Sequence, residues 1–365
     1  LFKSEHTFAI SATVKDFISS NSMHIALKIK DGLCDYFNQK VGSRPDVNTQ
    51  QPDIKIFARV VANKLSISID TTGEPLSKRG YRSQTTQAPL SENLAHALLR
   101  FASWHRLSEG FWEIEKNNHG SESESSFKSS GNPIYQERSG LQSDSGKKIP
   151  RQVLLSPFLQ DPMCGSGTIL IEAALSLLHW KPNARREYFS FFKLNCIEER
   201  ELGFHYKSLK TQILAMEKSV ADLFYCIENY KQKNNIELFD DTLSPLRGSD
   251  MSKSAIEVAR DCAHQAGVSK LISFQVNDAF QVRPHASLGT LVTNAPYGDR
   301  IGIKEDLPTM YRDFSDLWKQ KYKNWNIWFM SGNQEAIKEI GLRPTRKVSL
   351  FNGSIPCKLL QFIIY

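Results

Sequence analysis

The sequence predicts an α/β fold with a nucleotide-binding edge, and three successive features predict it. These are an apolar run over residues 153–159, a turn that contains Gly165 and Gly167, and an apolar helical pattern over 169–178. Glycine tolerates positive φ and lets a ligand approach the backbone, and a helix N-terminus offers unpaired N–H groups. A strand, a glycine turn and a helix in this order therefore indicate a nucleotide site.

The bulk composition indicates a globular protein of the reducing cytoplasm. The chain has 365 residues, which favours two domains or one large domain with an appendage. Apolar runs stay far shorter than the roughly 18 residues of a membrane helix, so no membrane partner is expected. The chain opens without Met, and we expect its true start to be missing. Its six cysteines are about 30 or more residues apart, which predicts free thiols and no metal site.

The charge balance favours a polyanionic partner. The formal net charge is +7 and the pI is near 9.0. Residues 1–82 hold 12 Lys and Arg against 8 Asp and Glu, so +4 of this charge lies in less than a quarter of the chain. A basic balance of this kind bears on nucleic-acid binding, although it says nothing about the fold.

The N-terminal region reads as a small α/β module. The residues Ile25, Ile29, Leu33 and Phe37 recur every four positions and predict one apolar stripe of a helix. Alternating or apolar runs predict strands on either side of this helix. The module therefore has the order strand, helix, strand, strand, over residues 8–14, 24–37, 54–61 and 65–70.

A composition change separates this module and the next helix from the glycine turn. Residues 88–101 predict a helix, with Leu90, Leu94 and Leu98 on one stripe. Residues 121–145 then contain 9 serines and 2 glycines among 25 residues. Such a segment buries too little apolar area to offset its ordering entropy. We therefore expect a mobile surface insertion over about 110–150.

The glycine turn favours S-adenosylmethionine (SAM) over a dinucleotide. A dinucleotide fingerprint needs a third glycine, and Leu170 stands in its place. Asp161 and Pro162 precede the turn instead, and this D-P-x-x-G-x-G pattern resembles the first motif of the SAM-dependent methyltransferases. In that family the glycines pack under the methionine part of SAM. The alternative is a plain strand-to-helix turn without a ligand.

Two further acidic residues follow predicted strands. Asp250 ends a short strand before the helix 254–266, which Gly267 terminates. An acidic side chain at the carboxyl end of a strand can accept both ribose hydroxyls of a nucleotide, although a helix-capping Asp is the alternative. Asp278 follows the strand 271–277, and the methyltransferase resemblance implies that it contacts the adenine amino group of SAM.

The run from Asn294 to Tyr297 resembles the N-P-P-Y box of methyltransferases that act on exocyclic amines of bases. An amine conjugated to a base is planar and a poor nucleophile. The Asn294 oxygen and the next carbonyl can accept its two hydrogens, Pro296 stiffens the turn, and Tyr297 can stack on a flipped base. Ala295 stands where the first proline is usual. We read this departure as a slight loosening, without loss of activity.

Together these motifs resemble the THUMP-domain methyltransferases that modify guanine in ribosomal RNA. Further matching runs are G-E-x-L-x-K-R-G-Y-R at 73–82 and L-x-N-G at 350–353, and the resemblance spans about 300 of the 365 residues. It implies a seven-stranded, Rossmann-like class I methyltransferase domain over 76–365. It also implies a smaller α/β THUMP domain for RNA binding over 1–75, whose ferredoxin-like part is truncated.

The resemblance implies three sets of site residues. The catalytic set is Asn294, Pro296 and Tyr297. The SAM-binding set contains Asp161, Pro162, Met163, Cys164, Gly165, Gly167, Thr168, Asp250, Met251, Asp278, Ala279 and Asn294. The RNA-binding set contains Lys78, Arg79, Tyr81, Arg82, Arg185 and Arg186. For the basic residues around Tyr81, phosphate contact and base stacking are weighed against a solvated linker that contacts nothing.

The predicted activity is methylation of a guanine N2 amine in large-subunit ribosomal RNA, with SAM as cofactor and no metal. One alternative is an adenine-N6 methyltransferase acting on DNA, because the N-P-P-Y-type box alone does not name the base. Another is an RNA-binding assembly factor without catalysis, for which Ala295 is the only hint. The sequence leaves the oligomeric state open.

Overall fold

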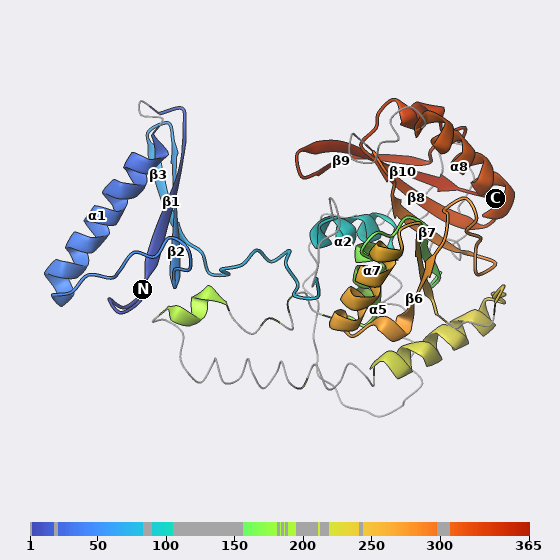
Figure 1. Ribbon diagram of the computed structural model, residues 1–365, viewed down its shortest axis with the longest axis horizontal. Helices are drawn as coiled ribbons and strands as arrows, with labels where there is room; N and C mark the ends of the chain where they lie inside the picture. The colour runs from blue at the N-terminus through green and yellow to red at the C-terminus, as the bar shows by residue number, and fades with distance from the viewer. Residues whose placement is uncertain are drawn as a thin grey trace. The chain divides into compact units, whose positions relative to one another are not determined.

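The computed structural model divides the chain into two compact units (Figure 1). The first unit combines Leu1–Arg79 with Pro182–Leu214, and the second combines Gly80–Lys181 with Ala215–Tyr365. The first junction lies four residues beyond the boundary expected from the sequence. The structure describes residues 2–17, 21–82, 90–104, 156–180, 183, 186, 189–194, 211, 219–240, 244–297 and 307–365. The expected insertion at about 110–150 lies outside these residues.

The first unit is a three-stranded sheet with one helix. Helix α1 (Ser22–Val41) begins at Asn21, whose side chain accepts a hydrogen bond from the His24 backbone N–H, and ends at Gly42 in the left-handed region. Phe37, on the predicted apolar stripe, is buried in the core of this unit. Strand β1 pairs parallel with β2, which pairs antiparallel with β3. The strands span Phe8–Lys15, Ile54–Val61 and Lys64–Ile69.

A short segment from later in the chain joins this first unit. The Arg186 guanidinium donates to the Thr72 carbonyl at 2.7 Å and lies 4.8 Å from the centre of the Phe189 ring. The backbone N–H of Phe191 donates to the Thr71 carbonyl at 2.9 Å. This segment includes the short 3₁₀ helix η1 (Ser190–Lys193). The sequence alone had assigned it to the methyltransferase domain.

The second unit contains a seven-stranded sheet in the order β6-β5-β4-β7-β8-β10-β9. The first five of these strands run parallel, and β10 is antiparallel to both β8 and β9. The strands are β4 (Leu159–Asp161), β5 (Leu246–Asp250), β6 (Ile272–Val276), β7 (Gly289–Asn294), β8 (Trp325–Ser331), β9 (Arg346–Asn352) and β10 (Ile355–Ile363).

Helices cover both faces of this sheet, as a parallel sheet requires (Figure 1). Helices α2, α5 and α7 contribute to one hydrophobic core, and α8 contributes to a second core with β7, β8 and β10. The helices are α2 (Glu92–Phe101), α5 (Thr168–Leu177), α7 (Lys253–Ala266) and α8 (Leu307–Lys321), with short 3₁₀ helices η2 (Ser269–Leu271) and η3 (Ala336–Glu339).

The predicted fold class is confirmed: a seven-stranded α/β domain follows a smaller α/β unit. Gly267 ends α7 in the left-handed region, with φ of 74°, as the sequence indicated. The five described cysteines are free thiols. No helix among the described residues has both the length and the apolar character that a membrane crossing needs.

Candidate functional site

Four predicted side chains lie at one edge of the large sheet. Strands β6, β5, β4 and β7 are neighbours and run parallel, so their carboxyl ends meet at the same edge. Asp250 ends β5, Asp161 ends β4 and Asn294 ends β7, while Asp278 comes two residues after β6. The topology therefore brings together the positions on which the sequence interpretation depends.

Both glycines of the turn between β4 and α5 are in the left-handed region of the backbone. Gly167 has φ of 74°, and a Cβ there would lie 2.9 Å from the Phe274 ring. Gly165 has φ of 50°, and no described atom lies within 4 Å of the place where its Cβ would be. Gly167 is thus needed for packing against β6, whereas Gly165 leaves open space at the turn.

Asp250 holds this turn in place. Its Oδ2 accepts a hydrogen bond from the Gly165 backbone N–H at 3.0 Å, and its Oδ1 accepts one from the Ser252 backbone N–H at 2.9 Å. The Cys164 backbone N–H donates to the Ser249 carbonyl at 2.9 Å. Each carboxylate oxygen has a second lone pair. Asp250 can therefore fix the turn and still accept a further hydrogen bond from a ligand.

Asp161 is buried and joins β4 to β7. Its Oδ1 accepts hydrogen bonds from the Thr293 hydroxyl at 2.7 Å and from the Met163 backbone N–H at 3.2 Å. None of the described residues donates to its Oδ2. Burial raises the pKa of Asp161 to about 7, and the negative charge of Asp250 acts in the same direction, while the two hydrogen bonds lower it.

Asn294 carries an unsatisfied acceptor. Its Oδ1 is buried, and no residue that the structure describes donates a hydrogen bond to it. Leaving a buried polar atom without a partner costs about 1–3 kcal/mol, so such atoms call for an explanation. Tyr297, three residues on, is half-buried, and its hydroxyl accepts a hydrogen bond from the Asn352 side chain at 2.6 Å.

The remaining predicted SAM-binding residues surround this edge. Asp278 receives a hydrogen bond from the Phe280 backbone N–H at 3.0 Å, and Met251 is 74% exposed beside Asp250. Pro162, Met163, Cys164, Thr168 and Ala279 all lie in the turns that follow β4 and β6 or at the start of α5. Burial raises the pKa of the Cys164 thiol well above its usual value, which keeps it neutral.

The residues just before α2 are less exposed than the predicted RNA contacts require. Tyr81 is 3% exposed, and its hydroxyl donates to the Glu172 carboxylate at 2.9 Å. Arg82 is largely buried and donates to the Thr168 hydroxyl at 3.1 Å and to the Leu90 carbonyl at 2.9 Å. The expectation that Tyr81 and Arg82 present themselves to RNA is therefore wrong. They fasten this segment to α5, and the first of them has no ring face available for stacking.

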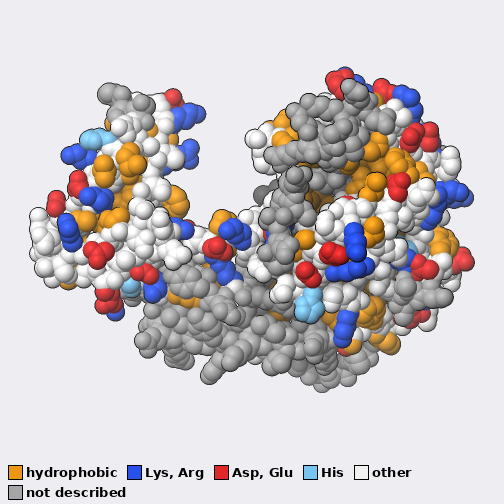
Figure 2. Space-filling view, viewed as in Figure 1, with side chains coloured by type: hydrophobic (Ala, Val, Ile, Leu, Met, Phe, Trp, Pro, Cys, Tyr) orange, Lys and Arg blue, Asp and Glu red, His pale blue; other side chains and the backbone are white. Residues whose placement is uncertain are grey.

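The other predicted RNA contacts have different environments. Lys78 is exposed and pairs with Glu74 at 3.5 Å, and Arg79 is half-buried. Arg186 is half-buried against Thr72 and Phe189, as described above, and Arg185 lies outside the described residues. Figure 2 shows acidic side chains among the basic ones on the visible face of each unit. Among the described residues that are visible in this view, the basic side chains of each unit are therefore mixed with acidic ones.

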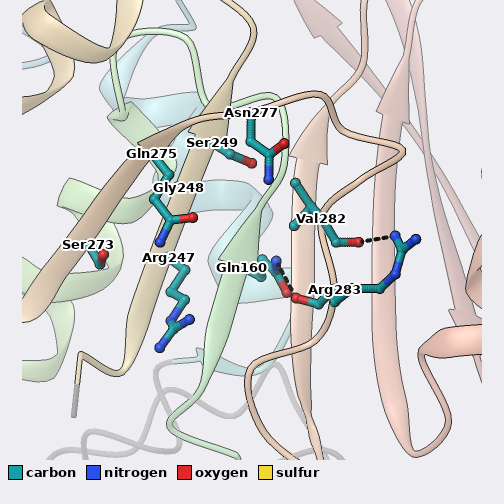
Figure 3. A pocket seen from close by; sticks show the side chains of 9 residues that line it. All are labelled: Gln160, Arg247, Gly248, Ser249, Ser273, Gln275, Asn277, Val282 and Arg283. Atoms are coloured by element: carbon teal, nitrogen blue, oxygen red, sulfur yellow. Dashed lines mark hydrogen bonds between the residues drawn. The ribbon is translucent and has the colours of Figure 1, made fainter. Parts of the chain in front are cut away.

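A small, open pocket lies elsewhere on the sheet (Figure 3). A Cβ on Gly248 would meet Leu170 of α5, so Arg247 and Ser249 must point to the opposite face. Gln160 donates to the Arg283 carbonyl at 3.1 Å across this pocket. None of the predicted site residues lines it. The lining consists of Gln160, Arg247, Gly248, Ser249, Ser273, Gln275, Asn277, Val282 and Arg283.

Sequence reasoning missed three residues that touch the predicted ones. Thr293 donates to Asp161, Asn352 donates to Tyr297, and Gly332 leaves room for the Tyr297 ring. A polar residue directly before Asn294 in an apolar strand was a usable signal for Thr293. Asn352 lies 55 residues from Tyr297, and its place in the L-x-N-G run was the only sequence signal that pointed to it.

The sheet order, the glycine turn and the acidic residues beside it are typical of α/β domains that bind a nucleotide-like ligand at the carboxyl ends of their strands. Among the described residues, no group of His, Cys, Asp and Glu side chains could hold a metal ion. A family model described as "RMKL-like, methyltransferase domain" matches residues 156–361, and a THUMP domain model matches residues 1–70. The chain therefore belongs to the RMKL-like methyltransferase family.

Curated relatives match over nearly the whole chain. A ribosomal RNA large subunit methyltransferase K/L from Methylococcus capsulatus is 31% identical over 358 residues, which is 98% of this chain and 39% of that protein. The protein of the same name from Psychromonas ingrahamii is 30% identical over 365 residues, with the same 39% of its length covered. The chain thus spans about two fifths of the length of these relatives.

Solved structures share the fold. A possible methylase from Clostridium difficile has a TM-score of 0.67 and 24% identity, over 100% of this chain and 76% of that one. A predicted N6-adenine-specific DNA methylase from Listeria monocytogenes has a TM-score of 0.65 and 19% identity, with 100% and 75% covered. At these identities the likeness concerns the fold alone.

Proposed function

We propose that this chain transfers a methyl group from SAM to the N2 amine of a guanine in large-subunit ribosomal RNA. The observation that carries the proposal is the buried Asn294 Oδ1, which lacks a donor among the described residues. It lies at the carboxyl end of β7, beside the strand that supplies Asp161. An exocyclic amine of a base is a donor that this oxygen fits.

The residues at the sheet edge fit SAM. The space at Gly165 admits a ligand against the backbone, and Asp250 retains lone pairs for ribose hydroxyls. The Asp161 Oδ2, to which none of the described residues donates, is available to a positively charged group. Bound SAM supplies an electrophilic methyl group. The network from Asp250 through Gly165 fixes the turn against which it would rest.

Asn294 orients the nucleophile. When its oxygen accepts one amine hydrogen, and the next backbone carbonyl accepts the other, the nitrogen lone pair becomes directed toward the donor side of the site. Positioning of this kind lowers the activation barrier for methyl transfer, because the entropy of orienting the amine is lost on binding and not in the chemical step. The proton leaves after the nitrogen has become cationic, so no strong base is needed at the start. Tyr297 would stack on the base, which must be flipped out of its helix to reach the site.

Two observations support the choice of ribosomal RNA. The curated relatives are named as large-subunit ribosomal RNA methyltransferases. The THUMP model matches the basic first unit, and we propose that residues 1–75 bind RNA ahead of a catalytic domain over 76–365. The choice of guanine N2 rests on the family resemblance of the sequence motifs. Lys78, Arg79 and Arg186 remain the candidate RNA contacts of the described residues.

Methyl transfer from labelled SAM tests this function. The chain is incubated with large-subunit ribosomal RNA lacking the modification, and separately with duplex DNA containing all adenine contexts. We expect label in the RNA as N2-methylguanine after digestion and mass analysis. Label only in DNA, as N6-methyladenine, would overturn the proposal. A chain that binds RNA but shows no SAM binding by calorimetry would instead be a non-catalytic assembly factor.

A further inference from the structure

Hydrogen bonds from α8 and β8 fix the backbone of the turn that follows β7. The Tyr311 hydroxyl donates to the Pro296 carbonyl at 2.8 Å and lies 2.7 Å from the Ser331 hydroxyl. The Ala295 backbone N–H donates to the Met330 carbonyl at 3.0 Å. Tyr311 is fully buried. These bonds fix the backbone up to Pro296, so that the side-chain torsions of Tyr297 set the position of its ring.

Two residues from other strands then restrict that ring. A Cβ on Gly332, which follows β8, would lie 2.6 Å from the Tyr297 Cδ2 atom. The Asn352 side-chain amide donates to the Tyr297 hydroxyl at 2.6 Å. Asn352 is the last residue of β9 and pairs with Ile355 across the hairpin turn. The ring is therefore confined at one edge by a glycine and at its tip by an amide.

We propose that Asn352 is a positioning residue for methyl transfer, because it holds the Tyr297 ring in the orientation that stacks on the target base. This inference rests on the proposed function, in which Tyr297 contacts the base. Rotation about the first side-chain torsion of a tyrosine moves its hydroxyl, so the hydrogen bond from Asn352 restrains that torsion. Rotation about the second torsion leaves the hydroxyl in place and swings the ring edge, which is the edge that lies against Gly332. Small losses of alignment between reacting groups cost large factors in rate, so the amide acts on turnover through the ring.

A double-mutant cycle tests this role. In the chain of 365 residues, Asn352→Ala is expected to lower kcat for labelled methyl transfer to unmodified large-subunit ribosomal RNA about tenfold. Tyr297→Phe, which removes the accepting hydroxyl, should cause a similar loss. The double variant should be no worse than either single one, because both remove the same bond. Asn352→Asp should restore kcat to within about threefold, since the tyrosine hydroxyl can then donate to the carboxylate.

The controls separate this role from folding and from the function itself. Ser354→Ala changes an exposed residue of the same hairpin turn and should leave kcat unchanged. SAM affinity, measured by calorimetry, should stay within twofold in every variant. Additive losses in the double variant, or a parent-like kcat for Asn352→Ala, would overturn the positioning role while the methylation remains. An unsubstituted chain that does not methylate this RNA would overturn the proposed function, and the inference with it.

Discussion

The two halves of the sheet edge differ in how their polar groups are satisfied. On the half formed by β4 and β5, Asp161 and Asp250 each accept two hydrogen bonds from the protein's own groups. On the half formed by β7, the Asn294 oxygen accepts none from the described residues. Each carboxylate of the first half is thus already hydrogen-bonded within the protein, whereas the Asn294 oxygen has no donor among the described residues.

This difference separates the groups that shape the SAM site from the group that we propose orients the substrate amine. A satisfied carboxylate fixes the turn around it and keeps spare lone pairs for a ligand. An unsatisfied buried oxygen is costly, and in the proposed function a substrate amine would supply the missing hydrogen. We therefore expect substitutions on the first half to act on SAM affinity and those on the second half to act on turnover.

The largest effect is expected at the unsatisfied oxygen. Asn294→Ala should lower kcat about a thousandfold, because removal of one orienting group in a preorganised site costs factors of this size. The affinity for SAM should stay within a few-fold by calorimetry. Asn294→Asp keeps an acceptor oxygen and should retain at least tenfold more activity than the alanine variant. Full turnover in the alanine variant would contradict the assigned role.

Asp250 provides the opposite case. Asp250→Ala removes the acceptor of the Gly165 N–H and should weaken SAM binding about fiftyfold. At saturating SAM, kcat should fall by less than about threefold, because Asn294 and Tyr297 on the β7 half are unchanged. Asp261→Ala, an exposed carboxylate on the following helix, serves as the control. A large loss of kcat with unchanged SAM affinity in Asp250→Ala would contradict the proposal that the first half acts on SAM affinity and the second on turnover.

The two crowded glycines sharpen the comparison. Gly332→Ala should displace the Tyr297 ring and lower kcat about tenfold, with little change in SAM affinity. Gly167→Ala meets the Phe274 ring in a left-handed conformation, so it should weaken SAM binding and lower the melting temperature. Thermal denaturation and calorimetry on the same samples measure both. Identical behaviour of the two variants would count against the division.

The smallest expected effect is a pH dependence from Asp161. Its pKa of about 7 in the folded chain exceeds the ordinary value of 3.8, so the folded state holds this proton more tightly. The resulting stability is complete below about pH 4 and is lost as the pH rises through about 7. Between pH 6 and 8 the free energy of unfolding should fall by about 1 kcal/mol more in the parent chain than in Asp161→Asn. Denaturant titrations at the two pH values check this difference, and equal slopes would contradict the raised pKa.

Sequence reasoning succeeded where local pattern and topology agree. Asp250 and Asn294 each end a predicted strand, Asp161 comes two residues after one, and parallel strands gather their carboxyl ends at one edge. It failed where a distant partner decides the environment. Tyr81 and Arg82 sit in a charged run that reads as solvated, and their burial depends on Glu172 and Thr168, about 90 residues away.

The same reason explains the contacts that the sequence did not reveal. Asn352 gains its role only because the hairpin of β9 and β10 returns to the end of β7, which no local pattern encodes. Likewise, nothing in the run around Arg186 and Phe191 indicates that it pairs with Thr71 and Thr72. These pairings belong to the tertiary structure.

The interleaved chain path of the first unit has a practical consequence for protein engineering. Because Pro182–Leu214 belongs with Leu1–Arg79, the polypeptide passes between the units three times, and no single cut separates them. A catalytic fragment that starts at residue 76 would keep Phe191 and Arg186 but lose Thr71 and Thr72, whose carbonyls accept their hydrogen bonds. Such a fragment would be prone to aggregate unless residues 182–214 were replaced by a short polar linker.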